Sequence, residues 1–122
     1  MSEPIQVEQF GKDHWSTLTY AESRCVDNKG ELDFRHMRTN PEKHPGSQGG
    51  HWAPGYATRL RDGSVIPGHD DWDCLDDLEK SGMVTVMSMV NGSVRMTDLG
   101  FEVVARIRKH LASGGNYAGF IF

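Results

Sequence analysis

The sequence from Trp72 to His110 is WDCLDDLEKSGMVTVMSMVNGSVRMTDLGFEVVARIRKH, and its beginning predicts a helix. Apolar residues recur there at the spacing of one helical face: Trp72, Leu75 and Leu78. Asp70 or Asp71 can cap this helix at its N-terminus, and Ser81-Gly82 ends it. We therefore expect the opposite, solvent-facing side to carry Asp73, Asp76, Asp77 and Lys80.

The pair Asn91-Gly92 predicts a β-hairpin in the middle of this segment, because both residues tolerate the positive φ angles of a tight turn. It joins an apolar run, 84–90, to a second strand at 93–97. With a two-residue loop, Met89 lies opposite Val94 and Met87 opposite Met96, so these side chains should form the apolar face of the hairpin.

A last helix begins at Thr97-Asp98 and is expected to bury four apolar residues: Phe101, Val104, Ile107 and Leu111. The order of helix, two-stranded wing and helix resembles the second half of a winged-helix domain. The end of the first helix, Leu78–Val84, and the stretch Arg95–Gly100 are similar to the pattern around the recognition helix and wing in that superfamily. The resemblance covers about a third of the chain and implies an α+β, winged-helix-like fold.

The residues before this segment complete one predicted domain. A helix capped by Asp13 should bury one face (Trp15, Leu18, Ala21 and Cys25), and 31–34 should be a short strand. The run 39–55 is too rich in Pro and Gly for a regular element, and a hairpin should follow around Asp62-Gly63. We expect a flexible arm at 1–10, a single domain at 11–113 with an insertion at 39–67, and a tail at 114–122.

Length and composition limit the class of protein. A chain of 122 residues has room for one core. It has no apolar run long enough to span a bilayer and no basic, hydrophobic signal region at its start, so we expect a cytoplasmic protein without membrane contact. Its two cysteines, Cys25 and Cys74, should then be reduced thiols.

The distribution of charge favours a protein partner over DNA. The net charge is -4, and the helix before the predicted wing, which usually enters the major groove, carries aspartates that repel phosphates. These aspartates can be a solvated face that suits the helix dipole, or they can bind a basic surface. The residues expected to contact such a partner are Asp70, Asp73, Asp76, Asp77 and, from the loop, Trp52.

The leading hypothesis is therefore a non-catalytic accessory binding protein. The whole chain resembles small proteins of phages and prophages, which implies that an inhibitor of a host nucleic-acid-handling or defence system is one concrete form. The alternative is a DNA-binding winged-helix regulator that uses a basic set instead of the helix: Arg35, Arg38, Arg59, Arg61 and Arg95. Winged-helix domains commonly dimerise, so a homodimer is a further expectation.

Metal binding and catalysis have little support in the sequence. Four residues of suitable type, Cys25, His36, His69 and Cys74, could surround a zinc ion, but their spacing matches no metal-binding motif. His69-Asp70 lacks the further residues of a metal phosphohydrolase, and no Ser or Cys lies in a nucleophile motif. The prediction is a protein with no metal, no cofactor and no catalytic residue.

Overall fold

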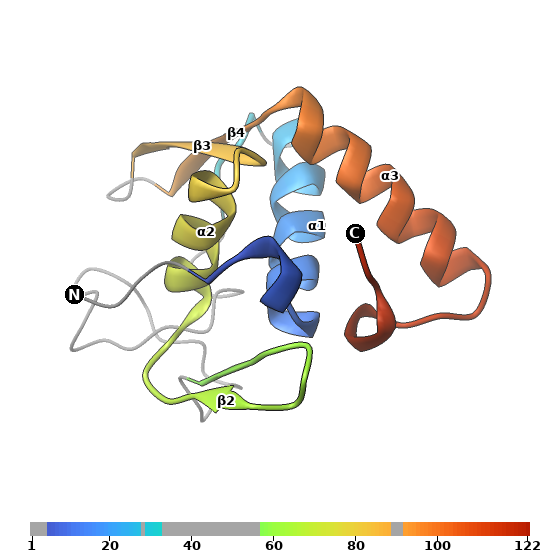
Figure 1. Ribbon diagram of the computed structural model, residues 1–122. Coiled ribbons are helices and arrows are strands. Elements are labelled where there is room, and N and C mark those ends of the chain that lie inside the picture. Colours follow the sequence, from blue (N-terminus) through green and yellow to red (C-terminus); the bar gives the residue numbers. More distant parts are fainter. Residues whose placement is uncertain (1–4, 28, 33–56, 89–91) are drawn as a thin grey trace.

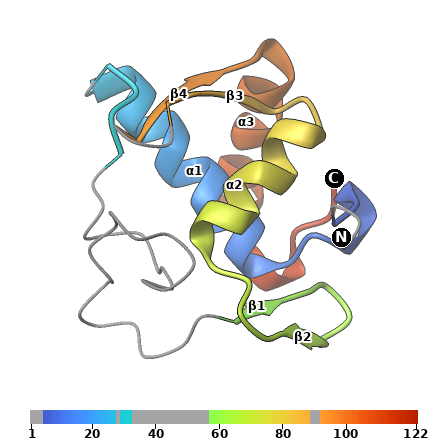
Figure 2. The same ribbon diagram turned by 90° about the vertical axis from the view of Figure 1, so that its left-hand side faces the viewer.

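The computed structural model describes residues 5–27, 29–32, 57–88 and 92–122 of the chain. This part of the chain contains three α-helices and two small antiparallel hairpins, which confirms the α+β class. Figure 1 and Figure 2 show α1 lying centrally, with α2 and α3 beside it and the two hairpins at opposite ends of the helices. Among the described residues, no helix is both long and apolar enough to cross a membrane.

Helix α1, Lys12–Asp27, is the predicted N-terminal helix, and it buries Trp15, Leu18 and Ala21 as expected. Beyond the end of the helix, Gly30 takes a positive φ of 82°. A Cβ atom at Gly30 would overlap the carbonyl oxygen of Val94, so the backbone can approach β4 this closely only at a glycine. Glu31 then pairs with Ser93 in an isolated antiparallel bridge.

The first hairpin consists of β1, Thr58–Arg59, and β2, Val65–Ile66, with Thr58 opposite Ile66. It confirms the predicted hairpin around Asp62-Gly63. The connection is a five-residue loop, 60–64, rather than a tight turn of two residues. Asp62 Oδ1 accepts the N–H of Ser64 at 2.9 Å, which closes the loop locally.

Helix α2, Asp71–Lys80, begins with a capping box. Asp70 accepts the N–H of Asp73 at 3.0 Å, and the Asp73 carboxylate accepts the N–H of Asp70 at 3.0 Å. The three predicted core residues of this helix are buried: Trp72, Leu75 and Leu78.

The second hairpin, β3 (Val84–Ser88) and β4 (Ser93–Met96), has a different register from the predicted one. Met96 pairs with Val84 rather than with Met87, a shift of three residues (87 − 84 = 3). An odd shift exchanges the two faces of a strand, so Val84 lies in the core and Met87 is 56% exposed. The register also shifts between Val86 and Ser88, an irregularity that a two-residue loop does not anticipate.

Helix α3, Asp98–Ala112, starts at the predicted cap, where Thr97 Oγ1 accepts the N–H of Gly100 at 3.0 Å. Its buried face contains Val103, Val104 and Ile107. The predicted core residue Phe101 is 44% exposed, because it lies about 100° around the helix from buried Gly100.

The described residues before α1 and after α3 contribute side chains to the core of the domain. The 3₁₀ turn η1, Val7–Gln9, leads to Phe10, which is 1% exposed. After the turn η3, Tyr117–Gly119, the ring of Phe120 meets Trp15 edge-on with centroids 5.0 Å apart. Phe10 and Phe120 are therefore part of the core.

Candidate functional site

A buried cluster of polar side chains lies where α1 meets α2: His14, His69, Cys74 and Asp77. Asp77 Oδ2 is 3.0 Å from His14 Nε2 and 2.8 Å from His69 Nε2, and Oδ1 accepts the N–H of Ile5 at 3.2 Å. Burial raises the pKa of Asp77, but the hydrogen bonds from both histidines and Ile5, with the charge of His69, hold it at about 2. Asp77 is therefore a carboxylate at neutral pH and can only accept.

This carboxylate fixes the hydrogen positions on both imidazole rings. Because Asp77 accepts from each Nε2 atom, both Nε2 atoms carry a hydrogen, and in a neutral ring the lone pair is then on Nδ1. His14 is 0% exposed and its ring stacks on Phe10, with centroids 4.2 Å apart and planes 4° apart. Its Nδ1 atom is buried and has no hydrogen-bond partner in the described part of the chain.

The thiol of Cys74 lies close to both imidazole rings. A ligand atom of Cys74 and one of each histidine all lie within 4.8 Å of one another. Thr58 Oγ1 is 3.3 Å from Cys74 Sγ and 2.8 Å from the carbonyl oxygen of His69. The carbonyl can only accept, so the Thr58 hydroxyl donates to it, and the thiol donates to Thr58 Oγ1.

The first hairpin is attached to α1 next to this cluster. Asp13 Oδ2 accepts the N–H of Arg59 at 2.8 Å, and Arg61 N donates to the carbonyl oxygen of Gln9 at 3.0 Å. These contacts fix β1 against the start of α1, which places Thr58 beside Cys74. The cluster thus joins three segments: the start of α1, the β1–β2 hairpin and α2.

The surface of α2 contains a second feature, an open groove of about 340 Å³ between α2 and β3. We call it the acidic groove, and its lining residues are Trp72, Asp73, Asp76, Glu79, Val86, Met87 and Ser88. Asp76 pairs with Lys80 at 2.7 Å, and both side chains are about half exposed. Three carboxylates therefore lie beside an exposed apolar side chain, that of Met87.

Two of the predicted partner-contacting residues are buried, and the expected placement of one of them, Asp77, is wrong. Asp77, expected on the outer face of α2, is 3% exposed and holds the two histidines. Asp70 is 0% exposed because it caps the helix. Asp73 and Asp76 do lie together in the acidic groove, and Trp52 is outside the described residues.

The basic set predicted for DNA binding does not form one surface among the described residues. Arg59 and Arg61 lie on the β1–β2 hairpin, whereas Arg95 lies on β4 at the opposite end of the helices (Figure 1). Arg35 and Arg38 are outside the described residues.

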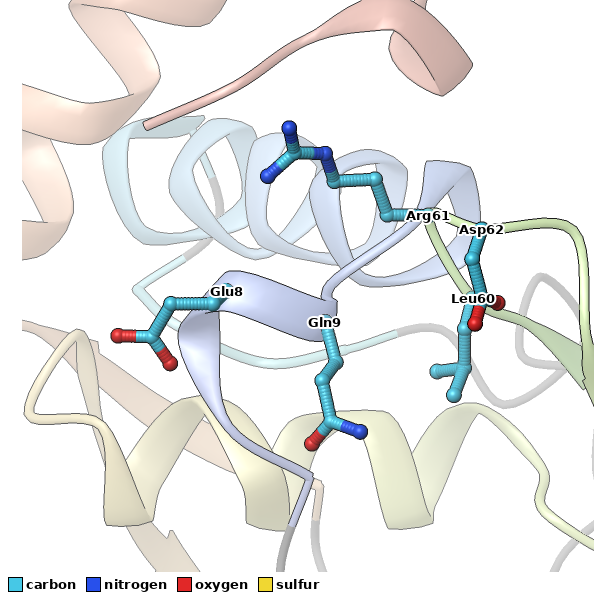
Figure 3. Close-up of a pocket in the computed structure, with 5 residues that line it drawn as sticks. All are labelled: Glu8, Gln9, Leu60, Arg61 and Asp62. Carbon is cyan, nitrogen blue, oxygen red and sulfur yellow. The ribbon is translucent and has the colours of Figure 1, made fainter.

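A further pocket lies between η1 and the β1–β2 loop. Figure 3 shows its lining residues, Glu8, Gln9, Leu60, Arg61 and Asp62, with the charged ends of the Glu8 and Arg61 side chains apart from each other. The charged groups do not converge on one point, so this pocket lacks the arrangement that binding of a charged ligand needs.

Of the four residues that the sequence offered as zinc ligands, the structure brings two together and places a third elsewhere. His69 and Cys74 come together, but Cys25 lies near the end of α1, where its thiol donates to the carbonyl oxygen of Val94 at 3.4 Å. His36 is outside the described residues. His14 was not predicted from the sequence as a member of the buried cluster. The available signal was its position directly before Trp15, at the edge of the predicted buried face of the helix.

Comparison of the chain with protein-family models, with curated proteins and with solved structures finds no match.

Proposed function

We propose that this chain is a non-catalytic accessory binding protein that engages a basic segment of a partner protein in the acidic groove. The observation that carries this proposal is the position of three carboxylates, Asp73, Asp76 and Glu79, beside the exposed Met87. Complementary charge accelerates encounter with a basic partner, and apolar contact with Met87 adds affinity that salt does not screen.

The order of elements supports a winged-helix-like scaffold for this groove. Helix α1 is followed by the bridge at Glu31 beside β4, then by α2, by the β3–β4 hairpin as the wing, and by α3. On this scaffold, α2 occupies the position of the helix that usually enters the major groove of DNA. Its carboxylates would lie next to phosphates there, which favours a protein partner over DNA.

The chemistry of the groove specifies the partner segment. Lysine or arginine side chains would lie along Asp76 and Glu79, and an apolar side chain between them would contact Met87. Such alternation occurs on surfaces that hold nucleic acid, so an inhibitor that occupies a nucleic-acid-binding surface is the concrete form we propose. This form also agrees with the resemblance to small phage and prophage proteins.

The test is fluorescence anisotropy with a labelled peptide that alternates arginine and leucine, measured at two salt concentrations. Asp76→Lys should weaken binding about tenfold, which is about 1.4 kcal/mol, because it reverses one groove charge. Met87→Ser should weaken binding equally at both salt concentrations. The matched control is Glu102→Lys, since Glu102 is in a similar exposed i,i+4 ion pair, with Arg106, but on α3.

The proposal is wrong if Asp76→Lys and Glu102→Lys change peptide affinity by the same factor. Labelled duplex DNA provides the second arm of the experiment. Tight DNA binding that weakens steeply with salt, and that Arg59→Ala and Arg61→Ala reduce, would favour the DNA-binding alternative instead.

A further inference from the structure

We infer that His14, His69 and Cys74 form a binding site for a zinc ion, with Asp77 holding both imidazole rings in position. The three residues come from separate segments: the start of α1, the connection between β2 and α2, and α2 itself. Their ligand atoms lie within 4.8 Å of one another. This site is independent of the acidic groove and of the function proposed for it.

The spacing of the ligand atoms suits a small ion. Zinc bonds of about 2.0–2.3 Å in a tetrahedral site place neighbouring nitrogen and sulfur atoms about 3.3–3.6 Å apart. The ligand atoms now lie within 4.8 Å of one another, so binding of an ion would draw them closer together.

His14 has a second ring nitrogen that is available as a ligand atom. Its Nε2–H is committed to Asp77, so Nδ1 presents a lone pair, and that atom is buried without a partner in the described residues. An unsatisfied buried polar atom costs about 1–3 kcal/mol, and coordination of a metal ion through Nδ1 would remove this cost. A ligating histidine whose other nitrogen donates to a carboxylate is the usual arrangement around protein-bound zinc.

The types of ligand identify the metal class. Two imidazoles and one thiolate favour zinc over magnesium or calcium, which prefer oxygen ligands. On binding, the Cys74 thiol loses its proton to solvent, and the Thr58 hydroxyl, 3.3 Å from the sulfur, can turn to donate to the thiolate. A water molecule can complete the tetrahedron from the side of His69, whose side chain is 14% exposed.

A zinc ion at this position would connect the segment that follows β2 to helices α1 and α2. His14 and Cys74 are each 0% exposed, so the ion would be enclosed on their side. An ion held by ligands from separate segments would contribute to folding stability, because those ligands come together only in the folded chain.

The experiment measures zinc affinity of the full chain by competition with a chromophoric chelator, together with the absorption spectrum of the cobalt-loaded protein. We expect one equivalent of zinc, a higher melting temperature when it is bound, and a cobalt–thiolate charge-transfer band. Cys74→Ser and His69→Gln should weaken zinc binding at least tenfold, and Cys74→Ser should abolish the band. Cys25→Ser is the matched control, because Cys25 lies outside the cluster, and it should retain both signals.

Three results would overturn the inference: no stoichiometric zinc binding by the native chain, a cobalt spectrum without the thiolate band, or equal affinity in Cys74→Ser and the native chain. If Cys74→Ser does not fold, the Cys25→Ser variant still decides the assignment. The only cysteine that remains in this variant is Cys74. If the variant loses the cobalt–thiolate band, the thiolate belongs to Cys25 and the site is refuted. If the variant retains the band, the thiolate belongs to Cys74.

Discussion

Replacing Asp77 with Asn tests how strongly the buried cluster stabilises the fold without any metal. The change keeps the size of the side chain and removes its charge. It affects three hydrogen bonds, because Oδ2 accepts from both His14 and His69 and Oδ1 accepts from the N–H of Ile5. An asparagine has one acceptor oxygen, so its amide N–H₂ must face either the histidines or Ile5.

Each orientation of the new amide leaves a mismatch. With the oxygen toward the histidines, two charge-assisted bonds become neutral ones and the Ile5 N–H loses its acceptor. With the N–H₂ toward them, a ring must move its hydrogen to Nδ1, and in His14 that atom is buried without a partner in the described residues. Charge-assisted bonds contribute about 1.5–3 kcal/mol against about 0.5–1.5 for neutral ones, so we expect a loss of about 2–4 kcal/mol of unfolding free energy.

The measurement is urea unfolding at neutral pH with a metal chelator present, followed by the fluorescence of the buried Trp15 and Trp72. Asp76→Asn is the matched control at the neighbouring position. It breaks only an exposed ion pair with Lys80, for which we expect less than about 0.5 kcal/mol. If Asp77→Asn costs no more than Asp76→Asn, the cluster does not stabilise the fold in the way its geometry indicates.

Three further substitutions test the packing around the site by the same unfolding measurement. Thr97→Ala should cost about 1–2 kcal/mol because it removes the cap of α3, and Thr97→Ser should restore most of it. Gly100→Ala should destabilise the fold by about 1–3 kcal/mol, because a Cβ atom there would overlap the carbonyl oxygen of Met83. The same change usually stabilises a helix, so a more stable variant would refute this contact. Phe120→Ala should cost about 3–5 kcal/mol and Phe122→Ala less than about 1, so equal effects would show that the C-terminal segment does not pack on Trp15.

The helices could be predicted from the sequence because their signals are local. Asp70 and Thr97 cap α2 and α3 as expected, and the apolar spacing identified the large apolar residues that α1 and α2 bury. The register of β3 and β4 could not be predicted in this way. It depends on which valines and methionines fit against the helices, and the pairing is shifted by three residues from the one that a two-residue loop gives.

The buried cluster escaped prediction because its stabilising contacts are distant in sequence. A helical pattern assigns a charged residue to the solvent side, and nothing near Asp77 indicates otherwise. The carboxylate is buried because His14, 63 residues away, and His69, 8 residues away, donate to it. The acidic groove could be predicted in part, since Asp73 and Asp76 follow from the spacing on one helix, but the contribution of Met87 depends on the observed register.

Asp76 and Asp77 are adjacent in the chain and serve the two proposed sites separately. Helix α2 turns the first toward the acidic groove and the second toward the histidines, because successive residues differ by about 100° around a helix. Asp76→Lys should therefore change affinity for a basic peptide and leave zinc affinity unchanged. Cys74→Ser should weaken zinc binding and leave peptide affinity unchanged, because Cys74 does not line the acidic groove. If Cys74→Ser also weakened the peptide while remaining folded, zinc binding and partner binding would be coupled through α2, and the cluster would regulate the groove.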